Sequence, residues 1–229
     1  MSLKIAQTCH ILMISASNPT VLLSGTRSGI INIIDTRLPF SGSDAIVHPS
    51  SIAHIKQIDA HRILVAGLSS TLRQYDLRFR KIDTPQWHDL PQYQYKKSRT
   101  KQYQKPHQKL KLQTTRPILS YPEYRNNATI RIGLDIDVEN GLIAAGQEGD
   151  DYTSQVELFS LHGGQRLITK VAQRCKFDNE EDRSTHVSRC VKWVDDGYGR
   201  GKSLWVGMGK DLKRFTWGTW EEGMDDYEY

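Results

Sequence analysis

Two short motifs place an aspartate and an arginine at the same spacing. Asp35-Thr36-Arg37 and Asp76-Leu77-Arg78 both have the form Asp-x-Arg, and their arginines lie 41 residues apart. A guanidinium offers five N–H donors in a fixed plane, which suits bidentate binding to carboxylates or carbonyls at an interface. We therefore take Asp35, Arg37, Asp76 and Arg78 as candidate binding residues, and we expect each aspartate to fix its own turn. The alternative is that both arginines are solvated residues at strand ends.

A second candidate site is a basic segment in the middle of the chain. From Leu90 to Pro122 there are eight Lys or Arg and no Asp or Glu. Interleaved tyrosines could stack on bases while the cations hold phosphates, or the segment could act as a nuclear localisation signal. The alternative, which we favour, is a solvated and partly disordered loop, so nucleic acid is the less favoured partner. The candidate residues are Lys96, Lys97, Arg99, Lys101, Lys105, Lys109, Lys111 and Arg116.

The motifs of several enzyme classes do not occur in the sequence. There is no phosphate loop, no Gly-x-Ser-x-Gly and no His-Glu-x-x-His. Cys175, His186 and Cys190 lack the spacing of a known zinc module and have no evident fourth ligand. We expect a non-catalytic protein that uses no cofactor or metal.

Each Asp-x-Arg motif ends a sixteen-residue stretch that reads as a β-hairpin. The first stretch is Leu22 to Arg37 and the second is Ile63 to Arg78. Each has a short apolar run, a turn at Ser28-Gly29 or Ser69-Ser70, and an alternating return strand. Two strands cannot bury a face alone, so each hairpin needs further strands. A unit of about 40 to 45 residues with four strands has the size of a β-propeller blade of the WD-repeat kind.

Four such units can be counted along the chain. The first has strands at residues 9–16, 21–25 and 30–34, with a short strand near 45–48. The second runs from residue 51 to 78. The third contains 117–121, 130–138, 142–146 and 155–161, and the fourth contains 187–194, 204–208 and 212–217. The sequence thus predicts an all-β propeller domain over residues 1–229, with an exposed basic insertion at 79–115 and an acidic tail at 221–229.

Composition sets further limits on the class of protein. Of 229 residues, 38% are hydrophobic, and no run approaches the roughly 18 apolar residues of a membrane helix. Three cysteines form an odd and sparse set, which suggests a reducing compartment. The formal charge of +5 comes from the basic segment, since removing its +8 leaves −3 for the rest. We expect a nuclear or cytoplasmic protein that does not enter a membrane.

The paired boxes resemble those of WD-repeat substrate receptors of cullin-4-type RING ubiquitin ligases. The stretches RPILSYPEY, GLIAAGQEGD, VELFSLHGGQRL and SLWVGMGKDLKRFTWG also look similar to a member of that family. The resemblance implies that the box arginine lies on one end face of the propeller and docks onto the ligase's damage-binding adaptor protein. Another face would then hold a protein substrate of unknown identity. A general WD scaffold for another complex is the alternative.

The chain departs from the family's pattern in three respects. A propeller of this family has about seven blades, so the four units could form part of a larger ring. Ile34 and Tyr75 occupy the place of the usual Trp, and the third and fourth units end in Phe159-Ser160 and Phe215-Thr216 without the acid. The Gly-His pair that often opens a WD repeat is missing, which leaves open whether the hydrogen-bond network that it supports is formed.

Overall fold

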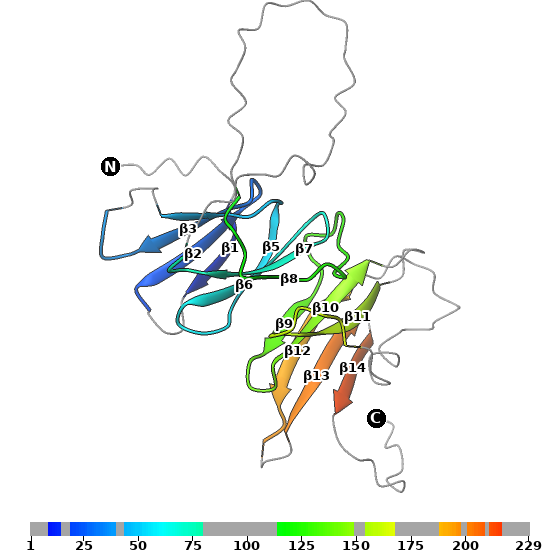
Figure 1. Cartoon of the computed structure of the whole chain (residues 1–229). Coiled ribbons are helices and arrows are strands. Elements are labelled where there is room, and N and C mark those ends of the chain that lie inside the picture. Colours follow the sequence, from blue (N-terminus) through cyan, green and yellow to red (C-terminus); the bar gives the residue numbers. More distant parts are fainter. Residues whose placement is uncertain are drawn as a thin grey trace, which may run out of the picture.

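The computed structural model describes residues 9–14, 19–39, 44–79, 114–148, 154–167, 188–197, 201–208 and 211–216. These residues form fourteen strands in four antiparallel sheets (Figure 1). The prediction of an all-β fold with four units is confirmed. No helix in the described part is long and apolar enough to cross a membrane. The basic residues 96–111, the acidic tail and Trp217 lie outside the described residues.

The first two sheets are four-stranded meanders. Sheet one has the order β1-β2-β3-β4, with strands at Cys9–Ile14, Val21–Thr26, Ile30–Asp35 and Ala45–Val47. Sheet two has the order β5-β6-β7-β8, with strands at Ile52–Gln57, Arg62–Gly67, Thr71–Asp76 and Leu119–Ser120. The chain between β7 and β8 contains all eight Lys and Arg residues of the basic segment. The predicted insertion therefore interrupts the second sheet rather than separating two sheets.

The last two sheets each have three strands. Sheet three contains β9 at Leu134–Asp137, β10 at Leu142–Glu148 and β11 at Ser154–Ser160. Sheet four contains β12 at Ser188–Asp195, β13 at Lys202–Met208 and β14 at Asp211–Thr216.

Two strand predictions for the third unit were wrong in part. The strand expected at 117–121 forms as β8, but it pairs with β7 of sheet two: Arg73 lies opposite Ser120, and Gln74 opposite Leu119. The outer position of sheet three is occupied instead by residues 165–167, where the Leu167 N–H donates to the Leu158 carbonyl. The strand expected at 130–138 begins only at Leu134, because residues 130–131 form a turn.

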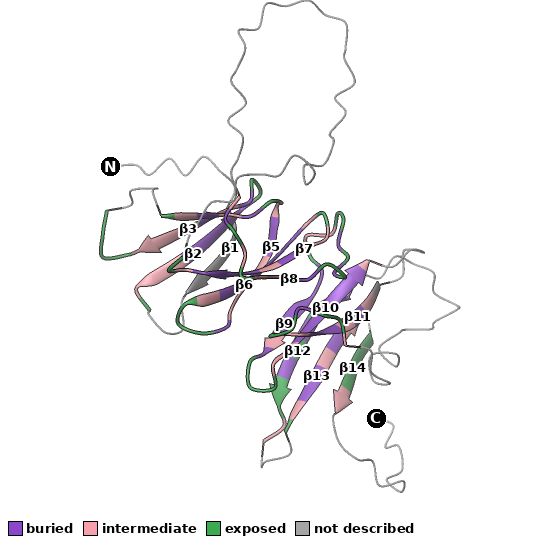
Figure 2. Ribbon diagram, in the orientation of Figure 1, coloured by how far each residue is buried: buried purple, intermediate pink, exposed green. Residues whose placement is uncertain are grey.

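The four sheets pack face to face in chain order. The first strands of successive sheets contact each other, β1 with β5, β5 with β9, and β9 with β12. Between the sheets lie three apolar cores, seen as purple ribbon in Figure 2. The core between sheets one and two contains Leu23, Ile31, Ile46, Ile52, Ile55, Ile63, Val65 and Tyr75. Figure 1 shows sheets one and four at opposite ends of this stack.

A buried carboxylate links three of the sheets. Asp135 on β9 accepts from Lys56 Nζ of β5 at 2.7 Å and from Lys192 Nζ of β12 at 3.1 Å. It also accepts the backbone N–H of Trp193 at 3.0 Å. Burial raises the pKa of Asp135, but the hydrogen bonds and charges of these partners outweigh it and hold the pKa below its ordinary value. Asp135 therefore stays ionised and ties sheet three to both neighbours.

A histidine network joins sheets one and two, although the sequence lacks the Gly-His pair. His48, just after β4, is fully buried, and its Nδ1 and Nε2 lie 2.9 Å from Tyr75 Oη and from Thr71 Oγ1. Ser50 Oγ lies 2.5 Å from the same Thr71 oxygen. Tyr75 holds the place of the usual Trp. The network thus forms without a Gly-His pair, because the histidine comes from the end of the preceding sheet.

We expect His48 to make stability depend on pH. Burial, with a smaller contribution from the Arg73 charge, lowers the pKa of His48 from 6.5 to about 3. A depressed folded-state pKa means that this stability is present above pH 6.5 and is lost as pH falls toward 3. Between pH 7 and pH 5 the wild type should lose about 2 kcal/mol through this residue.

Urea unfolding at pH 7 and pH 5 tests this prediction with His48→Gln as the comparison. Glutamine does not titrate, and every other ionisable group is common to both proteins. The wild type should therefore lose more stability than the variant over this range. Equal losses in the two proteins would contradict a buried neutral His48.

Candidate protein-docking face

The topology brings the ends of several strands to one end of the sheets. In each meander the first and third strands run in the same direction, so the ends of β3, β5 and β7 lie on one side. We call residues 35–38, 59–62 and 76–79 the arginine face. Both Asp-x-Arg motifs lie on it, each directly at the end of a third strand.

The two motifs have the same local geometry. In the first, Asp35 Oδ1 accepts the backbone N–H of Arg37 at 3.0 Å, which fixes the turn. The Arg37 guanidinium pairs with the same carboxylate through Nε to Oδ1 at 3.0 Å and Nη2 to Oδ2 at 2.7 Å. In the second, the corresponding three distances between Arg78 and Asp76 are 2.8, 3.0 and 2.8 Å.

These pairs fix the positions of the arginine side chains without burying them. The side chains of Arg37 and Arg78 are 65% and 55% exposed. The Arg37 side-chain hydrogen bond, with its backbone N–H, lowers the pKa of Asp35 to about 2. The Arg78 side-chain hydrogen bond likewise holds the pKa of Asp76 below its ordinary value. Both pairs are therefore ionised at neutral pH. Because Nε and Nη2 hold the carboxylate, Nη1 of each arginine lies outside the bidentate pair.

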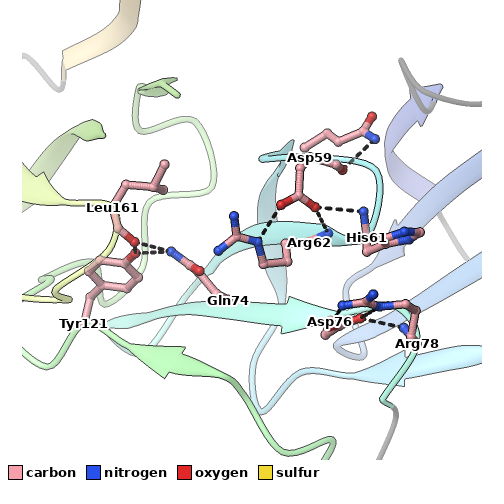
Figure 3. A network of polar contacts seen from close by, with 9 residues as sticks. Asp59, His61, Arg62, Gln74, Asp76, Arg78, Tyr121 and Leu161 are labelled. Carbon is pink, nitrogen blue, oxygen red and sulfur yellow. Dashed lines mark hydrogen bonds and ion pairs between the residues drawn. The ribbon is translucent and has the colours of Figure 1, made fainter. Parts of the chain in front are cut away.

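A third ion pair borders the second motif, as Figure 3 shows. Asp59 accepts the backbone N–H groups of His61 and Arg62, both at 2.8 Å, and pairs with Arg62 Nε at 2.6 Å. The His61 carbonyl in turn accepts the Leu77 N–H at 2.7 Å. This β5–β6 turn therefore supports the backbone between Asp76 and Arg78. Asp59 and Arg62 were not among the candidate residues, since they belong to no repeated pattern.

A buried polar cluster anchors β7 behind the second motif. Gln74 Nε2 donates to Tyr121 Oη and to the Leu161 carbonyl, both at 2.5 Å (Figure 3). Tyr121 Oη donates to the same carbonyl at 2.9 Å. Tyr121 follows β8 and Leu161 follows β11, so this cluster joins sheets two and three next to the arginine face.

The third sheet repeats the backbone turn without the charged pair. The Leu161 N–H donates to the Gly141 carbonyl at 2.8 Å, as the Leu77 N–H does to His61 and the Thr36 N–H to Thr20. Ser160 stands where the first two sheets have aspartate. Within the described residues, therefore, only sheets one and two present an Asp–Arg pair in this turn.

The structure does not describe the other candidate sites. All of the basic candidates except Arg116 lie outside the described residues, as do Cys175 and His186. Cys190 is an exposed free thiol. In the part of the chain that the structure describes, no three His, Cys, Asp or Glu side chains gather as metal ligands would.

The four stacked antiparallel meanders, two of four strands and two of three, define the class of fold, which is that of a WD-repeat β-propeller. No protein-family model and no curated protein matches the sequence. Solved structures do match. The chain is similar to one in the crystal structure of the Mitotic Checkpoint Complex, with 15% identity and a TM-score of 0.50, covering 91% of this chain and 52% of that one.

Two further solved structures are similar over nearly the whole chain. The Cps50 (Swd1) β-propeller domain of Myceliophteria thermophila has 10% identity and a TM-score of 0.53, with 93% and 55% of the two chains covered. Raptor from Chaetomium thermophilum has 10% identity and a TM-score of 0.57, with 96% and 16% covered. The chain thus spans about half the length of the first two of these three chains. Such low identity shows the fold alone.

Proposed function

We propose that this chain is a non-catalytic substrate receptor that docks onto the damage-binding adaptor of a cullin-4-type RING ubiquitin ligase. One observation carries the proposal: adjacent sheets present two Asp–Arg pairs of the same geometry on one face. Each pair holds an exposed guanidinium with Nη1 outside the pair, as Arg37 and Arg78 show. Fixed donors of this kind suit carbonyl and carboxylate acceptors on a protein.

The sequence supports the same proposal independently of the geometry. The two boxes resemble those of the receptor family, and the later part of the chain resembles one member, cullin-4-associated factor four. Another face of the propeller would hold the protein substrate. Such a receptor would work in the nucleus, the cytoplasm or both.

Direct binding to the adaptor tests the proposal. The full chain and the purified damage-binding adaptor should form a one-to-one complex in size-exclusion chromatography, with a Kd measurable by calorimetry. A folded chain that does not bind the adaptor would contradict the proposal and would favour a general WD scaffold of another complex.

A further inference from the structure

The arginine face also carries the two most exposed large apolar side chains among the described residues. Leu38 is 65% exposed and Phe79 is 63% exposed. Each directly follows a box arginine, so the two motifs read Asp-Thr-Arg-Leu and Asp-Leu-Arg-Phe. Exposed apolar residues are ordinary when scattered singly. Here the same position of two adjacent repeats is exposed and apolar, next to the same charged pair.

The backbone turn fixes both apolar residues in the same place. The Leu38 N–H donates to the Asp35 carbonyl at 3.1 Å, and the Phe79 N–H donates to the Asp76 carbonyl at 3.2 Å. The Arg78 guanidinium also lies 5.5 Å from the centre of the Phe79 ring, within cation–π range. Each box thus presents an oriented guanidinium and an adjacent apolar side chain as one unit.

The charges of this unit favour a protein partner over a nucleic acid. Within each box the aspartate neutralises the arginine, and the Asp59–Arg62 pair adds no net charge. Phosphate binding relies on uncompensated cations, and a phosphate would be repelled by Asp35 and Asp76. A protein surface can instead offer oxygen acceptors beside an apolar pocket, the combination found at interface hot spots.

We propose that Leu38 and Phe79 are apolar anchors of the docking interface, each filling a pocket beside the acceptors that bind Arg37 or Arg78. This inference rests on the proposed function, and its partner is the same adaptor. The partner surface would then carry two sites of one kind, each an apolar pocket flanked by carbonyl or carboxylate oxygens. Phe79 should contribute more than Leu38, since it is larger and is held against Arg78.

The test measures the Kd of the full chain for the adaptor by calorimetry. Leu38→Ser/Phe79→Ser should weaken binding about tenfold or more, which corresponds to the loss of hot-spot contacts. Leu212→Ser is the matched control, because Leu212 is 60% exposed but is the second residue of β14, near the start of a third strand, whereas Leu38 and Phe79 lie beyond the ends of third strands. It should leave the Kd unchanged. Leu38→Met/Phe79→Leu should retain binding. Thermal unfolding of each variant checks the fold.

The outcomes separate this inference from the proposed function. If the wild type binds and Arg37→Ala/Arg78→Ala does not, but the serine variant binds like the wild type, the anchors are overturned and the docking role stands. A wild-type chain that fails to bind overturns both. An equal loss in Leu212→Ser would also overturn the anchors, since it would show a general effect of removing exposed apolar side chains.

Discussion

Replacing Arg37 and Arg78 together with alanine is expected to abolish binding to the adaptor and leave the fold intact. The two side chains are more than half exposed, so the folded state does not depend on their packing. Alanine removes the outward donors and leaves the carboxylates of Asp35 and Asp76 without their cations. Those carboxylates would then face the acceptor oxygens of the partner. This repulsion adds to the lost hydrogen bonds, so the loss should exceed about 100-fold in Kd.

A matched variant separates this effect from a general loss of positive charge. Arg27 and Arg131 are also exposed, but they lie in turns at the opposite end of the strands. Arg27→Ala/Arg131→Ala removes the same charge and should bind the adaptor like the wild type. Arg37→Lys/Arg78→Lys should bind weakly, because an ammonium cannot hold the carboxylate bidentately and reach outward at once. Retained binding by the double alanine variant would rule out this docking mode.

Replacing Asp135 with alanine is expected to cost about 2–4 kcal/mol of unfolding free energy. The side chain of Asp135 is 5% exposed, forms ion pairs with Lys56 and Lys192, and accepts a hydrogen bond from the Trp193 N–H. Alanine leaves two lysines facing each other across the same position and orphans a buried backbone donor. Both lysines are partly exposed, so water relieves some of the loss, which keeps it below that of a fully buried pair.

Urea unfolding at pH 7 measures this cost, with Asp59→Ala as the control. Asp59 forms an equally short ion pair with Arg62, but both side chains are well exposed and both belong to one hairpin. Its replacement should cost no more than about 1 kcal/mol. The loss of unfolding free energy in Asp135→Asn should fall between the losses in Asp135→Ala and Asp59→Ala, since an amide oxygen can still accept a hydrogen bond. A loss of under about 1 kcal/mol in Asp135→Ala would show that the three-sheet link contributes little.

Local sequence information was sufficient to predict most strands and the place of the two boxes. The alternation of apolar residues and the presence of turn residues are both properties of adjacent positions. The strands β2, β3, β6 and β7 could therefore be placed from the repeat alone. Because Asp-x-Arg follows a third strand twice, its position at one end of the sheets follows from the topology. The pairing of each arginine with its own aspartate is also local, spanning two residues.

The contacts between sheets could not be predicted in this way. β8 was assigned to the wrong unit because the basic residues separate it in the sequence from β7, the strand with which it pairs. Asp135 and Lys56 are 79 residues apart, and no motif links them. His48 was not among the candidate residues. It precedes Pro49 at the end of one sheet, whereas the Gly-His pair typical of WD repeats stands at the start of a repeat. Leu38 and Phe79 were visible in the repeat, but only their exposure shows that they are not core residues.

The long connection between β7 and β8 is a convenient place to insert another protein domain. β7 ends at Asp76 and β8 begins at Leu119, so 42 residues join two neighbouring strands. Loop-closure entropy rises slowly with length, and doubling this connection would cost only about 0.6 kcal/mol. A fluorescent protein inserted there would be tethered beside Phe79, at the edge of the arginine face. Energy transfer to a labelled adaptor could then report docking in living cells without altering a single docking residue.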